Sequence, residues 1–470
     1  MLLVVEAAAM LALLRWITPV REQAIALGLY LAALPVYTLQ ILLARTLPQW
    51  ADNFSDSTRY DLNARALWRH WRGEAVSSAD FMLKGLEHNG IAEWLPGGSQ
   101  GYAEVFGMGR YFYQLYLAGI YALADGSRDT AVFANTIFLA GGAAGVFLLA
   151  QALFGLRRAA LLAAALTILD TNFAVWGSVL LRDTLIVFLV VLGFLGCVRL
   201  IKREGRRGQA LLICGGALSL LAVVRFNAVV ALALAAVGAA RPGLRTSRTG
   251  KAPLLLAGAA LLCFALAVLT MPGARTAWEN SLPGRLVEEN LRILGSAALV
   301  VDAASGTGAA GHNAKVNDVR RQWHSDLREQ PLGWLALRAA ARTLMGPYPW
   351  VALTRGISGT NFYELMYPGM ALWLGMLPCF LYALWKLPIR GDPAVALCLI
   401  WLALEAGFYI VGYGEFSGRE RMMAQPLLWI FAARGFADLF PGWLPAAATM
   451  KMPALVLAVF PRRWRRFPKM

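Results

Sequence analysis

The sequence predicts an all-α polytopic membrane protein with about 10–12 transmembrane helices and two extracytoplasmic helical loops. The first observation is composition. Of 470 residues, 58% are hydrophobic and 15% are charged, whereas roughly a quarter of the residues are charged in an ordinary soluble domain. The second is that apolar runs long enough to cross about 30 Å of hydrocarbon recur along the chain. The third is that basic residues gather in short loops between these runs.

The predicted transmembrane helices fall into two groups by length. Some apolar runs cross the hydrocarbon unaided, at residues 23–44, 130–156, 252–274 and 365–385. Other runs could cross only if a charge is tolerated within the span or if a neighbouring helix supports it. These runs lie at residues 159–180, 184–198, on both sides of Arg225, 393–414 and 422–433. The run that begins the chain is interrupted at Arg15, so it is either a retained first helix or an interfacial one.

The formal net charge of +16 is concentrated in loops that mark the cytoplasmic side. Residues 199–208 carry five basic residues and one acid, residues 241–251 carry four and none, and residues 461–470 carry five and none. Short loops rich in Lys and Arg stay in the cytoplasm. The longer segments 45–129 and 272–342, in which acids and bases nearly balance, are therefore expected on the opposite face. This distribution does not indicate a nucleic-acid-binding surface.

The same pattern divides the chain into membrane and loop segments. They are N-terminal membrane helices (1–44), a first extracytoplasmic loop (45–129), a transmembrane bundle (130–271), a second extracytoplasmic loop with an interfacial helix (272–345), a C-terminal transmembrane bundle (346–440), and an interfacial segment with a basic cytoplasmic tail (441–470). The interfacial helix is expected around residues 334–344, where Trp and Leu alternate with Arg.

Neither the cysteines nor the histidines have metal-ligand spacing. The cysteines lie inside apolar runs, so we expect small core residues and no disulfide: Cys197, Cys214, Cys263, Cys379 and Cys398. The histidines lie in the two long outer segments, where solvated side chains are expected: His70, His88, His312 and His324.

Ionisable residues collect at the predicted outer ends of the helices. Arg225 separates two apolar halves, so it either snorkels into headgroups at a tight turn or faces a cavity or an anionic ligand, which is the interpretation we favour. Arg182 and Asp183 open the run at 184–198. They are either an interfacial anchor or part of a polar site that includes Arg225.

The last outer loop contains Glu415, Arg419 and Arg421, immediately before an apolar run. Guanidinium groups are planar, permanently charged and bidentate, which suits phosphate oxygens. Together with Arg225, the two arginines are therefore candidates for binding phosphate or pyrophosphate at the membrane surface. The alternative is that they only cap an outer loop.

The first long apolar run is followed by Asp52, Asp56 and Asp61. A carboxylate at the water-facing end of a helix can act as a general base toward an acceptor hydroxyl. Residues three or four positions apart share a face of a helix, so Asp61, five residues after Asp56, would point away from it. Asp52 fits a cap on the approach to that helix, so Asp56 is the candidate base. The alternative is that Ser55 or Asp56 itself is the helix N-cap.

Four segments of the chain form a recognisable series. The first is "DSTRYDLNA", with Asp56, Tyr60 and Ala64, and the second is the pair of apolar runs at 131–169. The third is "VWGSVLLRDTL", which opens with a Ser and an acidic residue, and the fourth is "GRERMMAQP", with its arginines and proline. In this order the segments resemble the first outer loop, the paired helices, a later span and the late arginine segment of the GT-C class of integral membrane glycosyltransferases, especially the bacterial members similar to protein O-mannosyltransferases and lipid A aminoarabinose transferases. The chain departs from the pattern at Ser57, where a second acid is frequent.

The resemblance implies an inverting glycosyltransferase in the inner membrane of a bacterium, active on the extracytoplasmic face in cell-envelope glycan synthesis. The donor would be a polyprenyl-phosphate sugar of the undecaprenyl-phosphate type, and the acceptor a lipid, glycan or protein. A divalent metal is left open as a cofactor. The residues expected to form the site are Asp56 as catalytic base, Arg225, Arg419 and Arg421 at the donor phosphate, and Tyr60, Arg182, Asp183, Asn227 and Glu415 in support.

Other functions fit a multispan chain of this kind. One is a polysaccharide polymerase or ligase, which acts on lipid-linked repeats and also uses outer-face arginines. Another is a flippase or transporter for a lipid-linked sugar, with Glu405 as its ionisable residue at membrane depth. A transporter would be expected to show paired similar halves, and the sequence has no clear internal repeat.

Overall fold

The computed structural model describes residues 2–46, 55–76, 108–239, 330–345, 362–387, 392–413 and 419–442. The regular elements among these residues are all helical, which confirms the predicted all-α class for this part of the chain. The elements are α1 (Leu2–Ile17), α2 (Val20–Arg45), α3 (Ser55–Trp71), α5 (Met108–Leu123), α6 (Arg128–Phe154), α7 (Arg157–Leu169), α8 (Thr171–Gly177), α9 (Asp183–Lys202), α10 (Arg207–Val224), α11 (Phe226–Ala239), α16 (Leu332–Met345), η4 (Phe362–Met366), α18 (Tyr367–Lys386), α19 (Pro393–Tyr413), α20 (Arg419–Met422) and α21 (Gln425–Leu439).

Five helices of the described residues are long and apolar enough to cross a membrane: Val20–Arg45, Arg128–Phe154, Asp183–Lys202, Glu364–Lys386 and Pro393–Ile410. The pair α7 and α8 makes a sixth candidate span, bent by 47°. The apolar stretch around Arg225 forms two shorter helices, α10 and α11, that meet at this residue, as predicted. The predicted helix at 252–274 lies outside the described residues.

The N-terminal run forms one helix that continues past Arg15. This helix, α1, has 16 residues and ends at Ile17. It packs against α2 and α6, with Leu14 and Ile17 buried. The predicted helix around residues 334–344 is also present as α16, in which Leu335 is buried and Trp334 is exposed.

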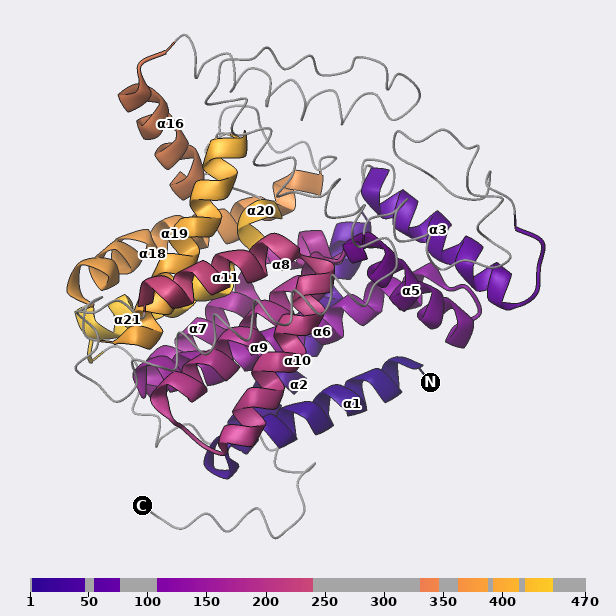
Figure 1. Cartoon of the computed structure of the whole chain (residues 1–470), viewed down its shortest axis with the longest axis horizontal. Coiled ribbons are helices and arrows are strands. Elements are labelled where there is room, and N and C mark those ends of the chain that lie inside the picture. The colour runs from indigo at the N-terminus through magenta and orange to yellow at the C-terminus, as the bar shows by residue number, and fades with distance from the viewer. Residues whose placement is uncertain are drawn as a thin grey trace.

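Helix α6 is the centre of the bundle and is buried along most of its length. It packs against α2, α7 and α9 (Figure 1). Helix α9 also packs against α10, and α18 packs against α21. Glycines permit the closest of these approaches. A Cβ atom on Gly196 of α9 would lie 2.6 Å from the backbone nitrogen of Cys214, and one on Gly435 of α21 would lie 1.9 Å from the carbonyl oxygen of Cys379. The four cysteines of the described residues are buried, as expected of core residues.

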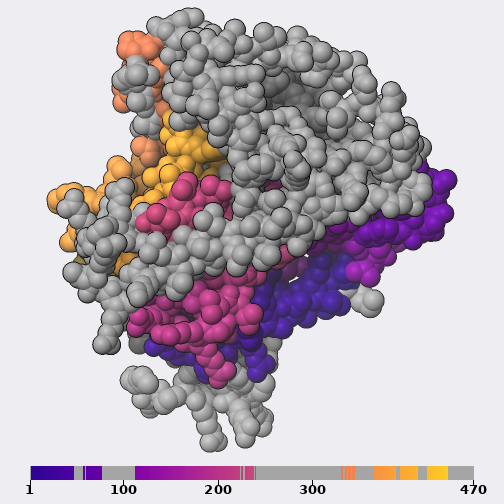
Figure 2. All heavy atoms as spheres, viewed as in Figure 1, coloured from indigo at the N-terminus to yellow at the C-terminus, as the bar shows by residue number. Residues whose placement is uncertain are grey.

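The chain order of the helices places two sets of loops at opposite ends of the bundle. At one end, Lys202, which belongs to the basic segment 199–208, forms an ion pair with Asp392 at the start of α19, with 3.1 Å between Lys202 Nζ and Asp392 Oδ2. Asp183 begins α9 at the other end, together with the starts of α6 and α11. Figure 2 shows the surface of α10 and α11 between the N-terminal and C-terminal helices. The residues discussed below gather at the end of α9 that lies away from the basic loop.

Candidate active site

The first turn of α3 lies against the segment that leads into α9. The Ser57 hydroxyl oxygen accepts a hydrogen bond of 3.0 Å from the backbone N–H of Leu180. Asp56 is the preceding residue and the second residue of α3. It lies within the helix instead of preceding it as an N-cap would. The Ser57 contact therefore puts the residue after Asp56 against Leu180, in the turn before α9.

A buried asparagine of α6 fixes the turn between α8 and α9. Asn135 Nδ2 donates hydrogen bonds to the carbonyl oxygens of Gly177 (2.9 Å) and Val179 (3.1 Å). Its Oδ1 accepts a bond of 2.9 Å from Thr184 Oγ1. One side chain thus holds both ends of the turn, which limits the movement of the residues between them.

Arg182 and Asp183 join the start of α9 to the end of α10. Arg182 occupies the N-cap position of α9, and its Nη1 donates a 2.7 Å hydrogen bond to the carbonyl oxygen of Val224. Val224 is the last residue of α10, where the helix break leaves carbonyl groups without intrahelical partners. Asp183 is 6% exposed and begins α9, where the partial positive charge of a helix N-terminus stabilises a carboxylate.

The break at Arg225 places a second arginine next to the residue that Arg182 binds. Arg225 has φ −150° and ψ 76°, so α10 ends before it and α11 begins at Phe226. Its guanidinium lies over the ring of Tyr409 in α19, 5.7 Å from the ring centroid. The Arg182 guanidinium binds the carbonyl oxygen of the residue immediately before Arg225, so it lies beside the backbone at Arg225 and joins this break to the turn that Ser57 contacts. Guanidinium groups at such a position suit an anionic ligand.

Arg421, which the sequence predicts at the donor phosphate, is enclosed by protein in the structure. It is 3% exposed, its Nη1 donates to the Thr343 carbonyl oxygen (3.1 Å), and its Nη2 lies 2.8 Å from Met370 Sδ. Its guanidinium also lies over the Trp373 ring. Burial lowers the pKa of Arg421 to about 10, and the negative charge of Asp170 opposes this shift, so the group stays charged at neutral pH. These contacts anchor α20 to α16 and α18.

Tyr60, a predicted supporting residue of the site, is buried in the contact between α3 and α5. It is 2% exposed and packs edge-on against Tyr113 of α5, with 5.3 Å between ring centroids. Arg419 begins α20, which contacts both α8 and α9. The side chains of three predicted site residues and the whole of a fourth lie outside the described part of the chain: Asp56, Asn227, Arg419 and Glu415.

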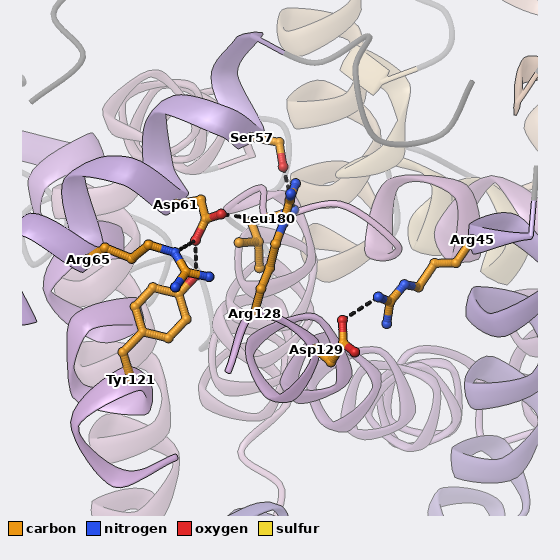
Figure 3. Close-up of polar contacts among 8 residues, drawn as sticks. All are labelled: Arg45, Ser57, Asp61, Arg65, Tyr121, Arg128, Asp129 and Leu180. Atoms are coloured by element: carbon orange, nitrogen blue, oxygen red, sulfur yellow. Dashed lines mark hydrogen bonds and ion pairs between the residues drawn. The ribbon is translucent and has the colours of Figure 1, made fainter. Parts of the chain in front are cut away.

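Asp61 is the centre of a polar cluster that the sequence did not predict (Figure 3). Its carboxylate accepts a 2.9 Å hydrogen bond from Arg65 Nε and another from the Tyr121 hydroxyl, and lies 3.5 Å from Arg128 Nε. These partners belong to α3, α5 and α6, so the cluster holds α3 in place. The pairing with Arg65 has a sequence signal, because residues four apart share a helix face. The pairing with Arg128 comes from tertiary structure and has none.

Asp170, at the bend between α7 and α8, is a second acid that the sequence did not single out. It is fully buried. Its Oδ1 accepts bonds from the backbone N–H (3.1 Å) and Nδ2 (2.6 Å) of Asn172, and its Oδ2 accepts one of 3.0 Å from Trp429 Nε1. A Cβ atom on Gly369 would lie 2.4 Å from Asp170 Oδ1, so α18 approaches this carboxylate closely. The sequence feature that could have identified Asp170 is its position as a single acid between two apolar stretches.

The described residues contain no group of three His, Cys, Asp or Glu side chains arranged to hold a metal ion. Where the resembled families often carry a second acid, this chain has Ser57, whose hydroxyl accepts the Leu180 N–H. A hydroxyl held in this way does not supply the carboxylate oxygens that divalent cations prefer. The chain therefore lacks, at positions 56 and 57, the acid pair on which such a metal site is built.

Comparisons with known proteins give a likeness of fold at low sequence identity. No protein-family model and no curated protein sequence matches the chain. Among solved structures, it is similar to the archaeal oligosaccharyltransferase AglB from Archaeoglobus fulgidus in complex with an inhibitory peptide and a dolichol-phosphate, with a TM-score of 0.48 and 15% identity over 91% of this chain and 53% of that one. It is also similar to the Archaeoglobus fulgidus oligosaccharyltransferase in complex with Zn and sulfate, with a TM-score of 0.42 and 16% identity over 86% of this chain and 49% of that one. The chain spans about half the length of these proteins.

Proposed function

We propose that the chain is an inverting glycosyltransferase that moves a sugar from a polyprenyl-phosphate donor to an acceptor on the extracytoplasmic face of a bacterial inner membrane. The observation that carries the proposal is the hydrogen bond from Arg182 to the residue before Arg225, next to the turn that the first turn of α3, which contains Asp56, contacts through Ser57. A base and an anion-binding pair are the parts that this reaction requires. The sequence resemblance described above supports the same class of reaction, in the synthesis of cell-envelope glycans.

The donor phosphate is bound by Arg225, with Arg182 beside it. Guanidinium groups offer several N–H donors in a fixed plane, and they stabilise the second negative charge that the phosphate gains when it leaves the sugar. Arg419 at the start of α20 is the further candidate ligand of this phosphate. Arg421 in this proposal anchors α20, because its own guanidinium is committed to Thr343, Met370 and Trp373.

Asp56 acts as the general base toward the acceptor. Its carboxylate takes the proton of the acceptor hydroxyl while the acceptor oxygen forms a bond to the anomeric carbon of the sugar. The bond between that carbon and the phosphate oxygen breaks on the opposite face, and polyprenyl phosphate leaves with the electron pair. Attack opposite to the leaving group inverts the anomeric configuration. Asp183 and Tyr60 support the base by shaping the wall between α3, α5 and α9, and Asn227 and Glu415 are proposed to line the site.

The second candidate function is transport of a lipid-linked sugar across the membrane. It is favoured by one observation, the 1% exposed carboxyl group of Glu405 in α19, since acids at membrane depth often serve ion or proton pathways. The reaction and the transport are separable by measurement, because only the reaction releases polyprenyl phosphate from its sugar.

The direct test uses the purified full-length protein with synthetic undecaprenyl-phosphate hexoses and pentoses and with the corresponding nucleotide sugars. Release of undecaprenyl phosphate is measured in the presence of a membrane-protein-free envelope glycan extract as acceptor. We expect release from at least one lipid-linked sugar and none from nucleotide sugars. Movement of intact lipid-linked sugar across liposomes without any release would contradict the proposal and favour transport.

A further inference from the structure

Glu405 is a buried acid that the proposed reaction does not use directly. It lies in the candidate span Pro393–Ile410 and is 1% exposed. A charged group enclosed at membrane depth is costly unless a partner of opposite charge accompanies it. The neighbours of Glu405 therefore indicate what the residue does.

The face of α19 that contains Glu405 is directed toward α11. Trp401, Glu405 and Tyr409 are spaced four residues apart and share one helix face. Trp401 Nε1 donates a 3.0 Å hydrogen bond to the carbonyl oxygen of Ala228 in α11, and the Tyr409 ring lies under the guanidinium of Arg225. Because the residues one turn before and one turn after Glu405 both contact the start of α11, Glu405 lies between these contacts.

Among the described residues, Arg225 supplies a positive charge that acts on the buried Glu405 carboxyl group. The Arg225 guanidinium thus lies over the Tyr409 ring, and the negative charge of Glu405, one turn of α19 before that ring, attracts it. A free arginine side chain has several rotatable bonds, and fixing it costs conformational entropy when a ligand binds. A ring and an acid that fix it beforehand remove this cost from ligand binding.

We propose that Glu405 is a positioning residue that, together with Tyr409, holds the Arg225 guanidinium at the α10–α11 break in the orientation that binds the donor phosphate. This inference rests on the proposed function of Arg225. It assigns the buried acid of α19 to donor recognition instead of to a transport pathway. Glu405 itself does not contact the sugar or the acceptor in this account.

The experiment is a double-mutant cycle on the purified full-length protein, with Arg225→Gln, Glu405→Gln and both together. The dissociation constant for undecaprenyl phosphate and the kcat and KM for the lipid-linked donor are measured for each. We expect Arg225→Gln to weaken undecaprenyl phosphate binding by about tenfold or more, the scale for loss of a charge-assisted contact. Glu405→Gln should raise the dissociation constant and the KM several-fold and leave kcat nearly unchanged. The double variant should be no weaker than Arg225→Gln, because Glu405 acts through Arg225.

Two further variants keep the test decisive if Glu405→Gln folds poorly. Tyr409→Leu removes the ring without removing a charge, and its effect on undecaprenyl phosphate binding should likewise vanish in the Arg225→Gln background. Asp438→Asn, which removes an acid paired with Arg434 on α21, is the matched control and should not change the dissociation constant. Thermal unfolding of every variant is recorded alongside.

The outcomes separate the inference from the proposed function. If Arg225→Gln weakens binding while Glu405→Gln and Tyr409→Leu do not, or if their effects add to that of Arg225→Gln, the positioning role is wrong and the donor site stands. If Arg225→Gln leaves undecaprenyl phosphate affinity unchanged, the proposed donor site itself fails, and the positioning role fails with it.

Discussion

Arg182 Nη1 donates a 2.7 Å hydrogen bond to the carbonyl oxygen of Val224, the residue immediately before Arg225. This bond ties the start of α9 to the break between α10 and α11. It brings together residues 42 positions apart in the sequence. The placement of the Arg182 guanidinium beside the backbone at Arg225, and with it the proposed donor site, depends on this connection.

Arg182→Lys is therefore expected to weaken donor binding while retaining the positive charge. An ammonium group on a flexible chain does not reproduce the planar guanidinium that reaches the Val224 carbonyl oxygen. The KM for the lipid-linked donor should rise about tenfold, the size of effect that accompanies loss of about 1.4 kcal/mol. Steady-state kinetics check this. Arg434→Lys, in an ion pair on α21, is the control and should leave KM unchanged.

Ser57→Ala tests the contact between α3 and the turn before α9. The substitution leaves the buried N–H of Leu180 without its acceptor, which costs about 1–3 kcal/mol. The thermal unfolding temperature should fall and kcat should fall with it, because Asp56 is the adjacent residue. Thr58→Ala, at the next position of α3, should change neither. Equal behaviour of the two variants would show that the Ser57 contact does not fix α3.

Asn135→Leu tests the side chain that holds the turn between α8 and α9. It removes the hydrogen bonds to Gly177, Val179 and Thr184, and the expected loss of stability is about 3 kcal/mol at about 1 kcal/mol for each bond. Chemical or thermal unfolding in detergent measures it. Gln151→Leu on the same helix is the control, since Gln151 Oε1 accepts no hydrogen bond among the described residues. A similar loss in both variants would contradict the role of Asn135.

Gly369→Ala tests the close approach of α18 to the buried Asp170. The new Cβ atom would lie 2.4 Å from Asp170 Oδ1 and 2.8 Å from Asn172 Nδ2, so the helix or the carboxylate has to move. We expect destabilisation of about 1–3 kcal/mol, the usual range for overpacking. Gly375→Ala on the same helix meets nothing within 4 Å. It should be neutral or stabilising, because alanine favours a helix over glycine by up to about 1 kcal/mol.

Asp170→Asn should expose the electrostatic link between Asp170 and Arg421. Without the acid, the enclosed guanidinium of Arg421 loses a compensating negative charge, so the free energy of unfolding should fall. The double variant Asp170→Asn, Arg421→Gln should recover part of this loss in an unfolding experiment, because it no longer buries an uncompensated charge. A double variant less stable than either single one would contradict the link.

Much of the helical framework follows from local pattern in the sequence. The runs at 23–44, 130–156 and 365–385 are long and apolar, and each coincides with a candidate span of the structure to within three residues. The break at Arg225 was also predictable, because a charge between two apolar halves cannot remain in a continuous span without a partner. Hydropathy alone identifies these features, since lipid requires a helix to satisfy its own backbone.

The parts of the site that the sequence did not reveal depend on contacts between distant residues. Nothing local indicates that Arg128 reaches Asp61, or that Trp429 donates to Asp170 across 259 positions. The burial of Arg421 was not predictable either. The sequence places this residue in a polar loop, whereas its contacts with α16 and α18 enclose the side chain. The residue types in a sequence indicate a class of chemistry, but they do not give the positions of the side chains in space.

The most direct test of the account is the rate of sugar transfer by Asp56→Asn in the purified full-length protein. The amide cannot take a proton from the acceptor, so kcat should fall by roughly 10²–10⁴-fold, the usual contribution of a general base. The dissociation constant for undecaprenyl phosphate should stay within about threefold of the unsubstituted protein, because the arginines that bind it are intact. A folded Asp56→Asn variant that transfers sugar at the original kcat would contradict the account.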